Sequence, residues 1–122
     1  MKEFVISWKT PTAARTSYYA GRNKYADLNG AKMFDTRDEA KKQLLKIQAT
    51  AGKPEYYQIV KLSSIHRMVN TPYGEVMLKP NLEDLNSCEV YIGDNYDDYL
   101  CDIDCHFDSS DKTIIDLLTN KI

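Results

Sequence analysis

Hydrophobic and polar residues alternate along several short stretches of the chain, which is the pattern of strands with one buried face. These stretches are rich in β-branched and aromatic residues, and Gly, Pro and Asn separate them. The pattern predicts strands over residues 2–8, 17–20, 56–62, 75–78, 88–92 and 96–107, and a short extended piece over 31–34. It also predicts turns at 21–23 and 71–74, a loop at 80–87, and a hairpin turn about Gly93-Asp94-Asn95.

A helical period replaces this alternation over residues 36–50. Thr36 and Glu39 have capping-box spacing, in which the Thr hydroxyl accepts a hydrogen bond from the backbone N–H of the Glu. Gly52, followed by Pro54, predicts a left-handed cap that ends this helix. The apolar stripe expected to face the core comprises Ala40, Leu44 and Ile47, with Leu45 beside them.

A second helix is expected over residues 110–121, with Ser109 or Ser110 as its N-cap. Asp111 falls in its first turn, where the helix dipole favours an acid. Together with the strands, these helices predict an α+β fold with a mainly antiparallel sheet. We expect a single domain over residues 1–122, because neither half has enough apolar elements to form a core of its own.

The size and composition are those of a globular domain. The 122 residues are enough to bury one core, and 43% of them are hydrophobic. No apolar run reaches the roughly 18 residues of a membrane span, and no signal-type run follows Lys2-Glu3, so we expect neither a span nor a leader. Three cysteines form no even disulfide framework, which favours a reducing cytoplasm.

Acidic and basic residues are unevenly distributed, although the formal net charge is only −2. Residues 1–61 hold twelve Lys and Arg against six Asp and Glu, a net charge of +6. Residues 62–122 hold four against twelve, a net charge of −8, and residues 81–111 contain ten acids and no Lys or Arg. This asymmetry indicates either a charged partner or neutralisation of one half by the other, within one molecule or head-to-tail in an oligomer.

The predicted hairpin carries acids that alternation places on one solvent-facing side: Glu89, Asp98, Asp102, Asp104 and Asp108. Successive residues on one face of a strand are about 6.6–7 Å apart, close to the spacing of consecutive phosphates along an extended nucleic-acid strand. Such a row would fit a groove lined by Lys and Arg. The predicted partner-binding residues are Glu89, Tyr91, Asp94, Tyr96, Asp97, Asp98, Asp102, Asp104 and Asp108, with Tyr99 as a further anchor.

Cysteine and histidine cluster near the end of this hairpin. Cys101, Cys105 and His106 are zinc-ligand types, but structural zinc sites pair such residues closely at two places in the chain. Alternation instead predicts one buried face, comprising Tyr99, Cys101, Ile103, Cys105 and Phe107, with His106 opposite and Cys88 upstream. The sequence contains no phosphate loop, nucleophile elbow or complete EF-hand loop.

We therefore expect the cysteines to pack in the core, and we expect no metal, cofactor or catalytic site. A cysteine- or metal-dependent enzyme is the third alternative, in which His66 or His106 would have to act as the base for a cysteine nucleophile.

The basic half offers an alternative site. Arg15, Arg22 and Lys24 lie near Tyr18 and Tyr25, and such cations and rings bind phosphates and stack on bases. They predict an alternative function as a sponge for a nucleotide signal or another phosphorylated small molecule. The opposing interpretation is that Tyr18 or Tyr19 belongs to the core. Direct binding of nucleic acid is disfavoured by the pI of about 5.6.

The first half contains a strand ending in Trp8, then Ser17-Tyr-Tyr-Ala-Gly21, then the run Ala26-Asp-Leu-Asn-Gly-Ala-Lys-Met-Phe-Asp-Thr-Arg-Asp-Glu-Ala40. Over about residues 1–62, this resembles a recurrent type of small accessory protein from bacteriophages and prophages. Several phage proteins of this size are anti-defence inhibitors, including anti-CRISPR proteins, and some are acidic mimics of nucleic acid. The resemblance implies a non-enzymatic inhibitor in the cytoplasm of a bacterial host, and it assigns no functional residue.

The predicted partner is accordingly a protein with a basic surface, such as a host nucleic-acid-binding protein or a CRISPR effector.

Overall fold

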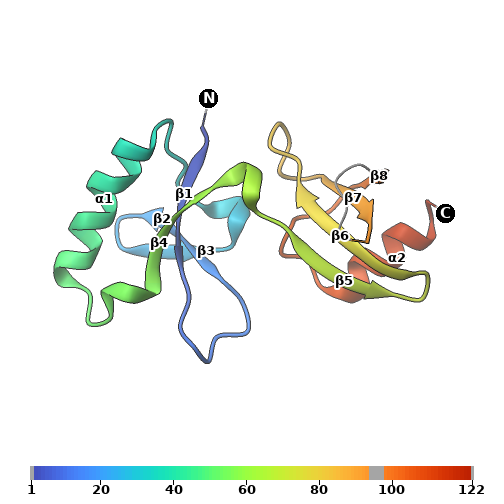
Figure 1. Cartoon of the computed structure of the whole chain (residues 1–122), viewed down its shortest axis with the longest axis horizontal. Coiled ribbons are helices and arrows are strands. Elements are labelled where there is room, and N and C mark those ends of the chain that lie inside the picture. Colours follow the sequence, from blue (N-terminus) through green and yellow to red (C-terminus); the bar gives the residue numbers. More distant parts are fainter. Residues whose placement is uncertain (1, 94–97, 122) are drawn as a thin grey trace. The chain divides into compact units, whose positions relative to one another are not determined.

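The computed structural model of the chain describes residues 2–93 and 98–121, which form two helices and eight strands in two antiparallel sheets. The predicted α+β class with two helices is confirmed, but the strands form two four-stranded sheets where one was expected. Contacts between residues divide the chain into two compact units, Met1–Ser64 and Ile65–Ile122, each with one sheet and one helix (Figure 1). A core shared by both halves stays a prediction.

The sheet of the first unit has the order β3-β2-β1-β4. Its strands are β1 (Phe4–Trp8), β2 (Ser17–Gly21), β3 (Lys24–Ala26) and β4 (Tyr57–Lys61). The predicted turn between 21 and 23 is confirmed, because Arg22 and Asn23 adopt φ angles of 51° and 60° in a tight hairpin. The extended piece predicted over 31–34 is not one of the eight strands, but it lies against the sheet. Ala31 is extended, the Lys32 N–H donates a hydrogen bond to the Tyr19 carbonyl oxygen at 2.8 Å, and Phe34 pairs with Phe4 in an isolated bridge.

Helix α1 (Arg37–Thr50) begins as predicted, with the Thr36 hydroxyl accepting a hydrogen bond from the Glu39 N–H at 3.2 Å. It packs against β1 and β4 (Figure 1). The buried core between helix and sheet comprises Ile6, Tyr19, Phe34, Ala40 and Ile47.

Two details of the α1 prediction are wrong. Leu45 was expected to flank the buried face of the helix, but its side chain is 57% exposed. The face of α1 that packs on the sheet is therefore narrower than the distribution of apolar residues along the helix predicts. The helix ends on Ala51 in an extended conformation, and Gly52 does not have the positive φ of a left-handed cap.

The second unit is a meander with the order β5-β6-β7-β8. Its strands are β5 (Arg67–Thr71), β6 (Gly74–Pro80), β7 (Cys88–Ile92) and β8 (Tyr99–Ile103). The predicted turn at 71–74 is confirmed, and the Thr71 hydroxyl accepts a hydrogen bond from the Tyr73 N–H at 3.1 Å. Strand β5, before this turn, was not predicted.

Helix α2 (Asp111–Thr119) closes the second unit and contacts β5 and β8. The predicted cap is Ser110, whose hydroxyl accepts a hydrogen bond from the Thr113 N–H at 3.2 Å. Ile114 and Leu118 are fully buried. The sheet residues that are at least 95% buried with them include Val69, Val76, Leu78, Cys88, Val90 and Ile103.

Strand β8 is shorter and less regular than the strand predicted over 96–107. On β7, Val90 and Tyr91 are neighbours, but their partners on β8 are Cys101 and Tyr99, so Leu100 is an extra residue. The strand ends at Ile103, and the segment from 104 to 110 that leads into α2 is irregular. This bulge and early end decide which side chains share a face.

Within residues 2–93 and 98–121, no helix is both long and apolar enough to cross a membrane.

Candidate partner-binding face

Most acidic residues belong to one compact unit of the chain and most basic residues to the other. The boundary between the compact units lies at Ser64, and because residues 62–64 carry no charge, the first unit holds twelve Lys and Arg against six Asp and Glu, and the second holds four against twelve. The first unit therefore carries the charge of +6 and the second the charge of −8. A charged partner would thus meet a unit with a strong field of one sign.

On the sheet of the second unit, Glu89 and Asp102 lie directly opposite each other on β7 and β8. Residues paired in this way have Cβ atoms about 4.5–5.5 Å apart on the same face. On the other side of Glu89, Lys79 of β6 is its direct partner. The row Lys79, Glu89 and Asp102 thus carries one positive and two negative groups.

Two tyrosines lie next to this pair of acids. The Tyr99 hydroxyl donates a hydrogen bond to Asp102 Oδ1 at 2.8 Å, and the Tyr91 hydroxyl donates to Glu89 Oε1 at 3.4 Å. The two rings meet edge to face, with centroids 5.7 Å apart and planes at 72°. The acids and tyrosines form one connected cluster, which we call the acid–tyrosine cluster (Glu89, Tyr91, Tyr99 and Asp102).

The bulge at Leu100 makes this cluster. Residues three apart on a regular strand face opposite sides of a sheet, but the extra residue brings Tyr99 to the side of Asp102. The prediction that Tyr99 lies on the buried face with Cys101 is therefore wrong, and its side chain is 53% exposed. Its proposed part as a surface anchor is compatible with this exposure.

The electrostatics of the cluster keep the Tyr99 phenol protonated. The hydrogen bond to Asp102, together with partial desolvation and the charge of Asp102, raises the pKa of Tyr99 to about 12. Tyr99 is therefore a hydrogen-bond donor at neutral pH, and it orients one lone pair of the carboxylate while leaving the others for a partner.

A row of apolar and aromatic residues borders the acids. Met68, Met77 and Tyr91 are direct partners across β5, β6 and β7, and Tyr99 continues the row on β8. Met77 is only 2% exposed, whereas Met68 is 37% exposed. Aromatic residues and Met are enriched in protein interfaces.

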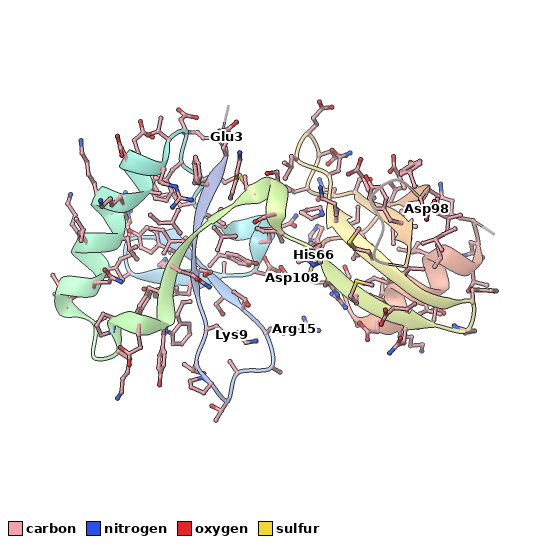
Figure 2. All side chains as sticks on the ribbon, in the orientation of Figure 1. Glu3, Lys9, Arg15, His66, Asp98 and Asp108 are labelled. Atoms are coloured by element: carbon pink, nitrogen blue, oxygen red, sulfur yellow. The ribbon has the colours of Figure 1, made fainter. Side chains whose placement is uncertain are left out.

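The other predicted acids are placed differently from the expected row. Asp98 precedes β8 (Figure 2), and its carbonyl oxygen accepts a hydrogen bond from the Ile92 N–H at 3.0 Å. Asp104, which is exposed, and Asp108, which is half-buried, follow the end of β8. Asp102 is thus the single acid within β8, and the expected regular pitch from 98 to 108 is absent from the strand. Asp94, Tyr96 and Asp97 lie outside the described residues.

The cysteines lie on the buried side of the same sheet. Cys88 and Cys105 are buried and Cys101 is half-buried, and all three are free thiols. Burial raises the pKa of the Cys101 thiol. His106 is exposed, as alternation predicted, and its Nε2 lies 3.0 Å from Asn86 Oδ1. In the described part of the chain, no three His, Cys, Asp or Glu side chains come together as metal ligands.

The three bases of the alternative phosphate site do not lie at one end of the first sheet. Arg15 precedes β2, on the loop from β1 (Figure 2), whereas Arg22 and Lys24 lie at the turn that follows β2. The five residues of β2 separate them by roughly 13 Å or more. The interpretation of Tyr18 and Tyr19 as core residues is confirmed, since both are buried.

Tyr25, the other ring of that alternative, is part of an aromatic cluster. Its ring centroid lies 5.4 Å from that of Trp8 and 6.0 Å from that of Tyr57. Burial and a hydrogen bond with Tyr57 raise the pKa of Tyr25. Its ring is engaged within the fold, which leaves less of it for stacking on a base.

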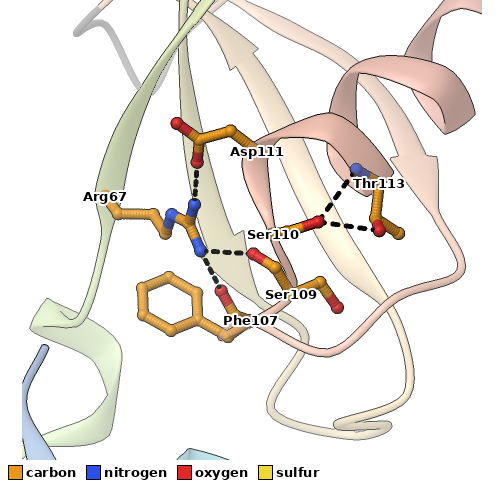
Figure 3. A network of polar contacts seen from close by, with 6 residues as sticks. All are labelled: Arg67, Phe107, Ser109, Ser110, Asp111 and Thr113. Atoms are coloured by element: carbon orange, nitrogen blue, oxygen red, sulfur yellow. Dashed lines mark hydrogen bonds and ion pairs between the residues drawn. The ribbon is translucent and has the colours of Figure 1, made fainter.

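Sequence reasoning missed Arg67, which joins β5 to the segment before α2. One of its guanidinium nitrogens donates hydrogen bonds to the carbonyl oxygens of Phe107 and Ser109, both at 2.9 Å. The other nitrogen pairs with Asp111 in the first turn of α2 (Figure 3). One feature of the sequence could have drawn attention to Arg67: it is one of only four basic residues in the acidic half.

Comparison with models of protein families, with curated proteins and with solved structures finds no match for this chain. The resemblance of residues 1–62 to phage accessory proteins therefore stays a prediction, and the function must be argued from the site.

Proposed function

We propose that this chain is a non-enzymatic, phage-type inhibitor that binds a basic surface of a host nucleic-acid-binding or defence protein, such as a CRISPR effector, in the bacterial cytoplasm. The observation that carries the proposal is the acid–tyrosine cluster, in which Glu89 and Asp102 lie side by side on a sheet face next to two tyrosines. Two adjacent carboxylates attract the Lys and Arg that line a nucleic-acid groove.

The surroundings of the cluster support the same kind of partner. The second unit has a charge of −8, which would steer a basic protein toward it at low ionic strength. The tyrosine rings offer faces on which an Arg guanidinium stacks while it also bonds to a carboxylate. The proposed mimicry uses this pair together with Asp98, Asp104 and Asp108 of the same unit, without a regular phosphate pitch.

The proposal has a direct test with charge-neutral isosteres. Glu89→Gln combined with Asp102→Asn removes two charges while keeping the oxygen atoms that accept from Tyr91 and Tyr99. The matched control is Glu83→Gln with Asp116→Asn, because both acids are exposed, lie in the same unit and are outside the cluster. Each double variant lowers the negative charge equally.

The immobilised chain is exposed to a nuclease-treated bacterial lysate, and the retained proteins are identified by mass spectrometry. We expect nucleic-acid-binding or defence proteins that duplex DNA displaces and that high salt releases. For a purified protein from this set, the cluster variant should bind roughly two- to thirty-fold more weakly, which is the effect of two ion pairs near the surface. Equal binding by both double variants, or retention that DNA does not reduce, would contradict the proposal.

The phosphate-sponge alternative receives less support, because β2 separates Arg15 from Arg22 and Lys24. Its own test is mass spectrometry of small molecules released from the heat-denatured protein.

A further inference from the structure

Two buried cysteines of the second unit lie in contact. Cys88 opens β7 and is paired with Ile103, the last residue of β8. The chain then turns back, because the Cys105 N–H donates a hydrogen bond to the Ile103 carbonyl oxygen at 3.1 Å. This turn brings Cys105 over Cys88, whose thiol donates a hydrogen bond to the Cys105 carbonyl oxygen at 3.4 Å.

The two thiols affect each other unequally. Interaction with the Cys88 thiol lowers the pKa of Cys105, and interaction with Cys105 raises the pKa of Cys88. The Ser109 hydroxyl and the positive charge of Arg67 further lower the pKa of Cys105. The pair is therefore asymmetric: Cys105 is the better thiolate, and Cys88 is a neighbouring protonated thiol.

We propose that Cys88 and Cys105 form a reversible intramolecular disulfide on reaction with a low-molecular-weight disulfide, with Cys105 as the attacking residue. The inference is independent of the proposed function, because it rests on the buried side of the sheet. Cys88 is completely buried and Cys105 is 7% exposed, so Cys105 is also the sulfur that an oxidant reaches first.

The reaction is a two-step thiol–disulfide exchange. The Cys105 thiolate attacks one sulfur of the small disulfide, the bond between its sulfurs breaks, and the departing thiolate takes up the proton that Cys105 released. Cys88 then loses its proton and attacks the Cys105 sulfur, which expels the second small thiolate, and that thiolate takes up the proton of Cys88. Two protein thiols are oxidised, and one small disulfide is reduced to two thiols.

The third cysteine serves as an internal control. Cys101 is paired with Val90, is half-buried, and has a raised pKa because of burial. Although Cys101 is more exposed than Cys105, its raised pKa leaves less of it as thiolate, so it should remain reduced under conditions in which Cys88 and Cys105 react. The Cys88–Cys105 disulfide itself would close a loop between residues that are 17 apart in sequence, and it would fix the segment before α2 to β7.

The experiment uses the unmodified full chain in buffers with increasing ratios of oxidised to reduced glutathione, quenched with acid and alkylated. Peptide mass spectrometry should show a Cys88–Cys105 link, the mass loss of two hydrogen atoms, and alkylated Cys101. The oxidised form should melt roughly 10 °C higher than the reduced form. Cys88→Ser should stop the reaction at a glutathione adduct on Cys105, and Cys101→Ser should leave the link intact.

Two results would overturn the inference: Cys88 and Cys105 that both remain alkylatable in glutathione disulfide, or a link that includes Cys101 instead. Neither result depends on whether a variant folds, because the link is first mapped in the unmodified chain.

Discussion

Glu89 and Asp102 face each other across β7 and β8, so two carboxylates lie side by side on neighbouring strands. Like charges in directly opposed positions destabilise a sheet. Lys79 is paired with Glu89 on the opposite side from Asp102, so its positive charge offsets the repulsion for Glu89 but lies one strand farther from Asp102. The arrangement costs stability in the unbound protein, and a basic partner would remove the cost on binding.

Asp102→Asn should therefore stabilise the chain by roughly 0.2–1 kcal/mol at low ionic strength. The amide oxygen still accepts from Tyr99, so the main change is the removal of the repulsion with Glu89. The gain should shrink as salt is added, because ions screen exposed charges. Urea denaturation at two salt concentrations measures it, with Asp116→Asn as the control; a gain that does not depend on salt would contradict this explanation.

The ionisation of Tyr99 gives a second prediction. Its pKa rises from 10.0 to about 12 in the folded chain, mainly because it donates a hydrogen bond to Asp102. Because the pKa of Tyr99 is higher in the folded than in the unfolded chain, this hydrogen bond contributes its full stabilisation of the fold below pH 10. That stabilisation is lost as the pH rises from about 10 to about 12. The ultraviolet difference titration of the wild type against Tyr99→Phe isolates this phenol. Asp102→Ala should return its midpoint toward 10.0; an unchanged midpoint would show that Asp102 is not the cause.

The contacts of Arg67 predict unequal effects of two substitutions. Arg67→Ala removes hydrogen bonds to two carbonyl oxygens and should lower the free energy of unfolding by about 2 kcal/mol. Asp111→Ala removes only a salt bridge whose carboxylate is 65% exposed, and should cost about 1 kcal/mol or less. Chemical denaturation of both variants measures the difference. Equal losses would show that the ion pair, rather than the carbonyl contacts, dominates.

Removal of either helix N-cap should lower the stability of the fold by a similar amount. Thr36→Ala and Ser110→Ala each remove a hydroxyl that accepts from a backbone N–H, and each should lower stability by about 1 kcal/mol. Thermal or urea denaturation measures this. Thr36→Ser and Ser110→Thr keep the acceptor and serve as controls, and losses in the controls as large as in the alanine variants would contradict a capping role.

The sequence was sufficient to locate features that depend on neighbouring residues. Thr36 and Ser110 begin the two helices because a cap satisfies backbone groups within three residues of itself. Alternation located the strands that became β1, β4 and β7, and the turn residues located two hairpins. The separation of charge was also visible in the sequence, and the two compact units carry net charges of +6 and −8.

Which residues belong to the candidate site depends on how β7 and β8 pair. The bulge at Leu100 arises where β8 pairs with β7, and a one-residue shift changes the face of every side chain beyond it. Tyr99 therefore joined the acids, contrary to the alternation of its own strand. The end of β8 at Ile103 likewise removed Asp104 and Asp108 from the predicted row.

By itself, the sequence determined where the helices begin, where most strands lie and how charge is divided, because these follow from short-range patterns and composition. Only the tertiary structure decided that Arg67 binds the segment before α2 and that Cys88 meets Cys105. The residues of each contact are far apart in the chain, and their approach depends on strand register and on a turn that no local pattern specifies. The acid–tyrosine cluster has the same origin.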